Sequence, residues 1–240
     1  MTPGPKRSME KIRNRLLASL PAADLSLLRR HAREVAIEQG QMLEYRGQPV
    51  DRVYFPETGL ISLIVPTAED STIEVGMFSR EGAVGLTAGL GSRISFIQAL
   101  VQVSGTAWCI PLSRFQAAAG HSPRIRTMIA RYAEMTVGQI QQTAACNGLH
   151  DVSARISRWL LQTSDKIDSD TIPFTQEFLG QMLGVQRTTI SQVVGELRKA
   201  GLVNTRHGRI EIVDRAGLRN EVCECYEIVR SHVDRLLAKP

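Results

Sequence analysis

Residues 174–201 read FTQEFLGQMLGVQRTTISQVVGELRKAG and predict two short amphipathic helices joined by a tight turn. Thr175 can cap the first helix, and Gly184 supplies the turn. Gly180, in the middle of the first helix, costs about 1 kcal/mol relative to alanine, so we expect the second helix to cross closely over it. In the second helix, apolar residues recur at helical spacing and predict a buried face of Ile190, Val193, Val194 and Leu197. The stretch is typical of a helix-turn-helix motif.

The opposite face of the second helix is polar near its start. Arginine fits guanine O6 and N7, glutamine fits adenine N6 and N7, and threonine or serine can take either base edge. We therefore predict that four residues read bases: Arg187, Thr188, Ser191 and Gln192. Residues beside them are predicted to contact phosphates: Thr175, Gln186 and Thr189.

A hairpin-like feature follows the two helices. Residues 202–205 and 210–213 are strand-like runs joined by a basic turn that contains glycine, which predicts a wing. Arg206 and Arg209 lie at its tip, where they can neutralise phosphates. Two packed helices alone also occur in proteins that never touch nucleic acid. The helix pair together with the wing favours double-stranded DNA as a partner.

Composition sets broader limits. The 240 residues are 43% hydrophobic and 22% charged, which indicates a folded chain long enough for two modest domains. A net charge of +5 favours an anionic partner without separating DNA from acidic protein or a membrane surface. Residues 1–20 are basic but lack a continuous apolar core, and no later run has the length of a membrane span. We therefore expect a cytoplasmic protein with no membrane partner.

The four cysteines are scattered along the chain, so we expect them to be reduced rather than paired. Cys223 and Cys225 could suggest a metal site. On a helix, however, residues i and i+2 point to different faces, and the sequence shows no second ligand pair nearby. We therefore predict no metal.

The rest of the chain predicts an α+β protein. Residues 40–111 contain short apolar runs between glycines and prolines, which favours an antiparallel, jelly-roll-like β-roll. A long helical pattern from Pro123 has residues seven apart and predicts a dimer seam of Ile125, Met128, Tyr132, Met135, Gln139 and Gln142. The alternative is a helix packed on its own barrel.

These patterns divide the chain into four predicted segments. They are N-terminal helices with a β-roll sensor at 1–120, a dimerisation helix at 121–149, a winged helix-turn-helix at 150–213 and a helical tail at 214–240. A dimer would place two recognition helices about 34 Å apart, on a pseudo-palindromic DNA site.

The chain resembles the Crp/Fnr family of bacterial transcription regulators in three stretches, TQEFLGQMLGVQRTTIS at 175–191, LHDVSARISRWLL at 149–161 and SREGAVG at 79–85. The resemblance implies a sensing β-roll, a homodimer, promoter DNA and RNA polymerase as a partner. Arg187 then stands in the place of the guanine-reading arginine. Thr188 and Gln192 stand where cAMP-type members have glutamate and a second arginine, so the operator should differ from theirs.

The sensor departs from cyclic-nucleotide-binding members, and its possible ligand pocket comprises Gly85, Leu86, Arg93, Ser95 and Gln141. Leu86 follows the cassette glycine where those members have glutamate, and Ser95 lies where they begin an Arg-Ser pair. A phosphate would lack its main charged partner unless Arg93 replaced it. We therefore disfavour cAMP. An iron–sulfur cluster is disfavoured because no cysteine precedes Cys109. No cofactor is predicted, although a haem-sensing barrel stays open.

Three other functions fit the sequence less well. The chain could be a signal-binding module that acts through protein contacts, or a cyclic-nucleotide-responsive regulator with an atypical pocket. An enzyme is not predicted, because the sequence has no nucleophile elbow, phosphate-binding glycine loop or H-E-x-x-H motif. The controlling signal and the direction of regulation are not readable from the sequence.

Overall fold

The computed structural model describes residues 12–66, 72–206 and 208–238. The chain forms two compact units. Unit 1 comprises Met1–Ser62, Phe78–Thr136 and Val233–Pro240, and unit 2 comprises Leu63–Met77 and Val137–His232. Part of the basic N-terminal segment considered above lies outside the described residues.

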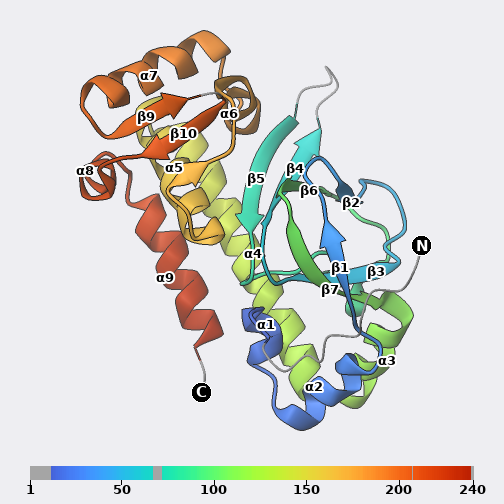
Figure 1. Cartoon of the computed structure of the whole chain (residues 1–240). Helices are drawn as coiled ribbons and strands as arrows, with labels where there is room; N and C mark the ends of the chain where they lie inside the picture. The colour runs from blue at the N-terminus through green and yellow to red at the C-terminus, as the bar shows by residue number, and fades with distance from the viewer. Residues whose placement is uncertain (1–11, 67–71, 207, 239–240) are drawn as a thin grey trace. The chain divides into compact units, whose positions relative to one another are not determined.

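Unit 1 contains an antiparallel three-stranded sheet in the order β1-β7-β3 (Figure 1). In β3, Val53 and Phe55 are fully buried while Arg52 is exposed, as the two-residue period of a strand requires. The strands and helices of this part are α1 (Arg15–Ala18), α2 (Ala22–Arg29), β1 (Arg33–Ile37), β2 (Met42–Glu44), β3 (Arg52–Pro56), η1 (Leu86–Gly89), β6 (Gln98–Val103), β7 (Gly105–Pro111) and α3 (Leu112–His121). With β4 (Leu60–Pro66) and β5 (Thr72–Phe78), they confirm the predicted α+β class with antiparallel sheets in the N-terminal part.

The long predicted helix is present as α4 (Pro123–Leu149), which has 27 residues. Its first apolar positions do not form an exposed seam. Ile125, Met128, Tyr132 and Met135 are each at most 4% exposed and belong to the hydrophobic core of unit 1. The Tyr132 hydroxyl also donates to the Ala83 carbonyl. These four side chains lack the exposure that contact with a second chain needs, so the predicted contact face is corrected.

The later seam positions also face their own chain. In unit 2, Gln139 donates from Nε2 to the Met77 carbonyl at 2.9 Å, and Gln142 donates from Nε2 to Cys225 Sγ at 3.0 Å. The exposed face of α4 is formed by other positions. They lie in two rows of seven-residue spacing, 130, 137 and 144 in one and 134, 141 and 148 in the other. Heptad spacing therefore identified a packed helix, but the packed partner is this chain's own core.

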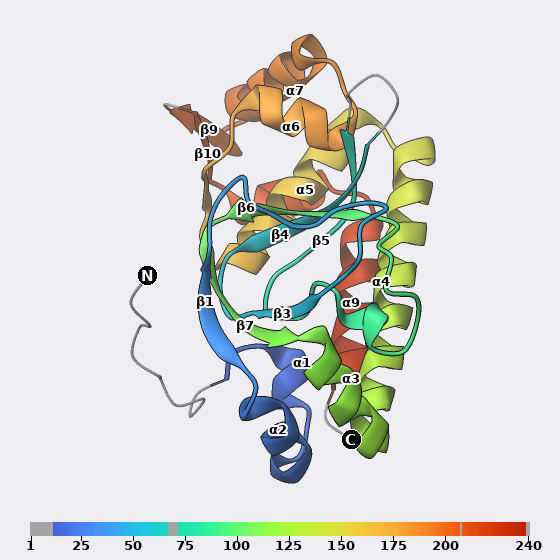
Figure 2. The same ribbon diagram turned by 90° about the vertical axis from the view of Figure 1, so that its right-hand side faces the viewer.

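Unit 2 contains the predicted helix-turn-helix and wing (Figure 2). Its core includes Trp159, whose indole Nε1 donates to Glu74 Oε1 at 2.9 Å and whose ring meets Phe174 edge-on. The elements after α4 are α5 (Val152–Ile167), β8 (Thr171–Ile172), α6 (Gln176–Leu183), α7 (Arg187–Lys199), β9 (Val203–Arg206), β10 (Arg209–Ile212), α8 (Arg215–Asn220) and α9 (Cys225–Leu237). Among the described residues, no helix is both long and apolar enough to cross a membrane.

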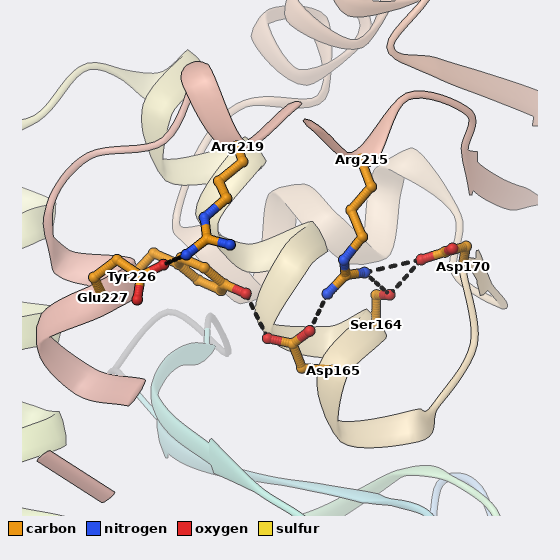
Figure 3. Close-up of polar contacts among 7 residues, drawn as sticks. All are labelled: Ser164, Asp165, Asp170, Arg215, Arg219, Tyr226 and Glu227. Atoms are coloured by element: carbon orange, nitrogen blue, oxygen red, sulfur yellow. Dashed lines mark hydrogen bonds and ion pairs between the residues drawn. The ribbon is translucent and has the colours of Figure 1, made fainter. Parts of the chain in front are cut away.

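A polar network joins the C-terminal tail to α5 (Figure 3). Arg215 donates to Asp165, to Asp170 at 2.9 Å and to the Ser164 hydroxyl at 2.7 Å. Tyr226 donates from its hydroxyl to the other Asp165 oxygen at 2.6 Å. One carboxylate thus links the start of α8 and the first turn of α9 to the end of α5. Within unit 2, the tail is packed against the domain that carries the helix-turn-helix.

Candidate nucleic-acid interface

The turn between α6 and α7 forms as the sequence predicts. Thr175 precedes α6, and its Oγ1 accepts a hydrogen bond from the Phe178 amide at 3.1 Å. Gly184 ends α6 with φ of 63°, in the left-handed region that glycine enters without strain. A Cβ on Gly180 would lie 2.7 Å from the Val185 carbonyl oxygen. The close approach is therefore made by the turn, whereas the nearest atom of the second helix, Ile190 Cγ1, would lie 3.4 Å from that Cβ.

The two faces of α7 divide as predicted. Ile190, Val193, Val194 and Leu197 are all buried. The four predicted base-reading residues, Arg187, Thr188, Ser191 and Gln192, are all exposed. Their outward placement leaves the polar side of α7 open to a groove of DNA.

Two of these side chains make surface hydrogen bonds. Ser191 donates from Oγ to Gln176 Oε1 at 2.8 Å, and Gln192 donates from Nε2 to Glu196 Oε1 at 3.1 Å. The residues that make these bonds are exposed or half-buried, so base edges can replace the partners without leaving a buried polar group unpaired. Their roles in base reading stay predictions.

The wing is a β9–β10 hairpin in a three-stranded sheet with β8. Arg206 and Arg209 are directly opposite in the antiparallel register, and both are exposed. Like charges directly opposite each other repel, and a phosphate between or beside them would relieve that repulsion. Gly208, with φ of 75°, supplies a left-handed position in the turn.

The remaining predicted phosphate contacts surround the start of α7. Thr175 and Gln186 are exposed, and Thr189 is half-buried. Gln186 is the N-cap residue of α7 and makes no side-chain capping bond. A helix N-terminus directs amide groups and the positive end of its dipole outward, where an anion is stabilised.

This geometry is matched by a known domain family. Residues 154–221 match the Crp-like helix-turn-helix domain, a range that contains most of α5 and all of α6, α7, the wing and α8. This part of the chain is therefore similar to the DNA-binding domain of Crp-type regulators. The global nitrogen regulator of Synechococcus elongatus is 20% identical over 194 residues, which cover 77% of this chain and 87% of the regulator.

Solved structures share the Crp/Fnr fold with this chain. FixK2 from Bradyrhizobium japonicum is 15% identical with a TM-score of 0.69, over 80% of this chain and 98% of FixK2. A CRP/FNR-family transcriptional regulator from Thermus thermophilus is 20% identical with a TM-score of 0.66, over 83% of this chain and all of the regulator, 100%. The similarity therefore extends beyond the helix-turn-helix domain to most of the chain.

The predicted pocket residues are divided between the two units. Gly85 adopts a left-handed conformation with φ of 73°, Leu86 is fully buried, Ser95 is buried and Arg93 is exposed. Gln141 is exposed and belongs to unit 2. The structure thus groups Gly85, Leu86 and Ser95 in one unit without adding a buried arginine to them.

Sequence reasoning missed Glu44 of β2, which lies against this group. Burial raises the pKa of the Glu44 carboxyl, while hydrogen bonds with the Ser95 side chain and the Gly85 amide lower it. In cyclic-nucleotide-binding members, by the resemblance above, the corresponding glycine belongs to a phosphate cassette. Here the carboxyl group of Glu44 forms a hydrogen bond with the backbone of that glycine. That cAMP is not the ligand stays a prediction. No sequence signal marked Glu44.

The structure also brings together residues that the sequence analysis kept apart. The thiols of Cys146, Cys223 and Cys225 and one ring nitrogen of His150 all lie within 4.8 Å of one another in unit 2. Cys225 is the first residue of α9 and Cys223 precedes that helix, so the helical argument against a shared direction does not apply. The premise that no second ligand pair stands nearby was wrong. Cys146 and His150 supply that pair, and their spacing of one helical turn was the signal available in the sequence.

Cys109 is separate from this group and lies in unit 1. Burial raises the pKa of its thiol, although the neighbouring Arg52 opposes that shift. A thiol with a raised pKa carries little thiolate near neutral pH and reacts slowly. Cys109 therefore has the properties of a packing residue in the strand β7.

Proposed function

We propose that this chain is a homodimeric transcription regulator that binds a pseudo-palindromic promoter site through α7 and the wing. The observation that carries the proposal is the exposed polar start of α7 beside the opposed wing arginines, Arg206 and Arg209. The match to the Crp-like helix-turn-helix domain supports DNA as the partner, and the resemblance to Crp/Fnr regulators suggests RNA polymerase as the machinery it acts on. Unit 1 would receive a controlling signal whose chemistry is not identified.

In this proposal the two kinds of contact have different tasks. Arg187, at the first position of α7, would donate two hydrogen bonds to a guanine and so select sequence. The wing arginines and the α7 N-terminus would bind phosphates, which fixes register and adds affinity without selecting sequence. Mutating a residue of each kind should therefore produce different defects.

The exposed face of α4 supports the homodimer. Val137 is 52% exposed although it is apolar, and Ala144 and Gly148 follow on the same face at helical spacing. Small residues allow two helices to approach closely, and the seven-residue repeat keeps such a face aligned along a partner helix. A two-fold symmetric dimer would place α4 of a second copy of this chain against this face.

The test is a DNA-binding titration with purified full-length protein. A bound promoter fragment, isolated by selection from genomic DNA, is compared with a scrambled duplex of the same length and composition. The wild type should bind the selected fragment far more tightly, and Arg187→Ala should reduce this preference. Arg114→Ala is the matched control, because Arg114 is an exposed arginine on α3 and its loss changes the net charge equally. Equal wild-type affinity for both duplexes would refute sequence-specific binding, and an intact function in Arg187→Ala would favour a role through protein contacts.

A further inference from the structure

We propose that Cys146, His150, Cys223 and Cys225 form a structural zinc site in unit 2. Their four donor atoms lie within 4.8 Å of one another, and the three cysteines are buried. Three thiolates and an imidazole are a common ligand set for Zn²⁺ in structural sites. The site is independent of the DNA-binding proposal, because none of its residues lies on α6, α7 or the wing.

Two of the separations between donor atoms match those around a single ion, and all the others are at most 4.8 Å. Tetrahedral zinc, with Zn–S of about 2.3 Å and Zn–N of about 2.0 Å, separates its ligand atoms by roughly 3.5 to 3.8 Å. Cys146 Sγ lies 3.5 Å from Cys223 Sγ, and Cys225 Sγ lies 3.5 Å from His150 Nδ1. An iron–sulfur cluster places iron and sulfide atoms between its ligands and so holds thiolates farther apart. The 3.5 Å sulfur separation is also far longer than a disulfide bond, which is about 2.0 Å.

The surroundings orient the ligands. His150 Nε2 lies 3.2 Å from Glu224 Oε1, so a hydrogen on Nε2 leaves the Nδ1 lone pair directed at the thiols. A carboxylate that holds the second nitrogen of a zinc-binding histidine is a frequent feature of such sites. Gln142 donates from Nε2 to Cys225 Sγ at 3.0 Å, a bond that stabilises a thiolate.

The charge around the group also suits zinc. Three thiolates, a neutral imidazole and Zn²⁺ leave one net negative charge. Arg155 and Arg158 are two buried arginines of α5, and both interact electrostatically with the Cys146 side chain. Their guanidinium groups would offset the negative charge of the loaded site.

All four ligands come from the protein, so the site has no open position for a substrate and its role is structural. Cys146 and His150 belong to the end of α4 and the residue after it, whereas Cys223 and Cys225 flank the start of α9. The ion would therefore cross-link the end of α4 to the tail segment after α8. This assigns a role to the paired tail cysteines, which the sequence alone left without one.

The experiment measures metal in the purified full-length chain. Protein is isolated under reducing conditions without added metal, and zinc is measured by mass spectrometry. After removal of metal with a chelator, the chain is titrated with Co²⁺ and then with Zn²⁺. We expect a single zinc ion per chain, intense visible bands of tetrahedral cobalt with thiolate ligands, and loss of those bands when zinc is added.

Variants assign the site. Cys223→Ser should lose the cobalt bands, whereas Cys109→Ser, a buried cysteine of unit 1, should keep them. Because Cys223→Ser could fail to fold, Glu224→Gln is measured as well. Glu224 is exposed and is not a ligand, and its loss should weaken zinc affinity by about 10- to 100-fold with unchanged circular dichroism.

Four results would overturn the zinc site. They are a wild-type chain that takes up neither zinc nor cobalt, iron and sulfide in place of zinc, equal metal loss in Cys109→Ser and Cys223→Ser, and a Cys146–Cys223 disulfide that forms instead of metal binding. Unchanged zinc affinity in Glu224→Gln would overturn the orienting role of that carboxylate.

Discussion

Replacing Arg209 by alanine should separate DNA affinity from protein stability. Arg209 is exposed and lies directly opposite Arg206 across the β9–β10 hairpin. Like charges in that position are destabilising, whereas favourable cross-strand pairs contribute about 0.2 to 1 kcal/mol. Arg209→Ala should therefore leave the free energy of unfolding unchanged or raise it slightly.

The same change should alter how DNA binding responds to salt. Each phosphate contact steepens the dependence of log K on log salt by about 0.9 for duplex DNA. A dimer has two wings, so Arg209→Ala removes two contacts and should make the slope shallower by about 1.8. Over a fourfold rise in salt, the wild type should then lose roughly tenfold more affinity than the variant loses.

The assay is fluorescence anisotropy of a labelled operator duplex at a series of potassium chloride concentrations. Arg114→Ala removes the same charge from α3 and should keep the wild-type slope. The scrambled duplex should show the same change in slope as the operator, because phosphate contacts do not read sequence. An unchanged slope in Arg209→Ala, or an equal change in Arg114→Ala, would refute the assignment of the wing to phosphates.

Substitutions at three other places test the base-reading helix, the exposed face of α4 and the packing of the turn. Arg187→Ala should cost about 1 to 3 kcal/mol of binding free energy and relax the preference at one base pair of each half-site. The measurement uses a panel of duplexes with single base-pair substitutions. Equal weakening on all of these duplexes would contradict base reading. Val137→Glu should yield monomers in analytical ultracentrifugation, because it places a charge on the exposed face of α4. Ala23→Glu, at an exposed position of α2, should leave the dimer intact. A dimeric Val137→Glu variant would exclude this face of α4 as the dimer contact. Gly180→Ala should lower the free energy of unfolding by about 1 to 3 kcal/mol, since its Cβ would lie 2.7 Å from the Val185 carbonyl oxygen. Gly195→Ala, with no atom within 4 Å of the new Cβ, should raise that free energy by about 0.5 to 1 kcal/mol, and denaturant titrations that show equal effects would contradict the packing argument.

The helix-turn-helix could be predicted because its signals are local. Thr175 caps its own helix, Gly184 takes the left-handed turn, and the spacing of Ile190 to Leu197 fixes which side of α7 is buried. Each signal acts over a few residues, so tertiary structure did not have to be known. The same holds for β3, where alternation places Val53 in the core.

Features that depend on distant residues were not predictable. The heptad pattern of α4 shows that one face is covered, but it cannot say whether a second chain or the chain's own core covers it. The core covers Tyr132. Cys146 meets Cys223 only because the chain returns to α4 after 77 residues, and no local pattern contains that distance. Glu44 likewise meets Gly85 through the fold of unit 1.

The central claim is that the chain reads DNA sequence as a two-fold dimer. Selection of bound duplexes from a random pool with the purified full-length chain tests it most directly. We predict enrichment of a pseudo-palindromic site with half-sites one helical turn apart, about 34 Å between centres, and loss of enrichment at one base pair per half-site in Arg187→Ala. Enrichment of no sequence, with equal affinity and the same salt slope for selected and scrambled duplexes, would contradict it.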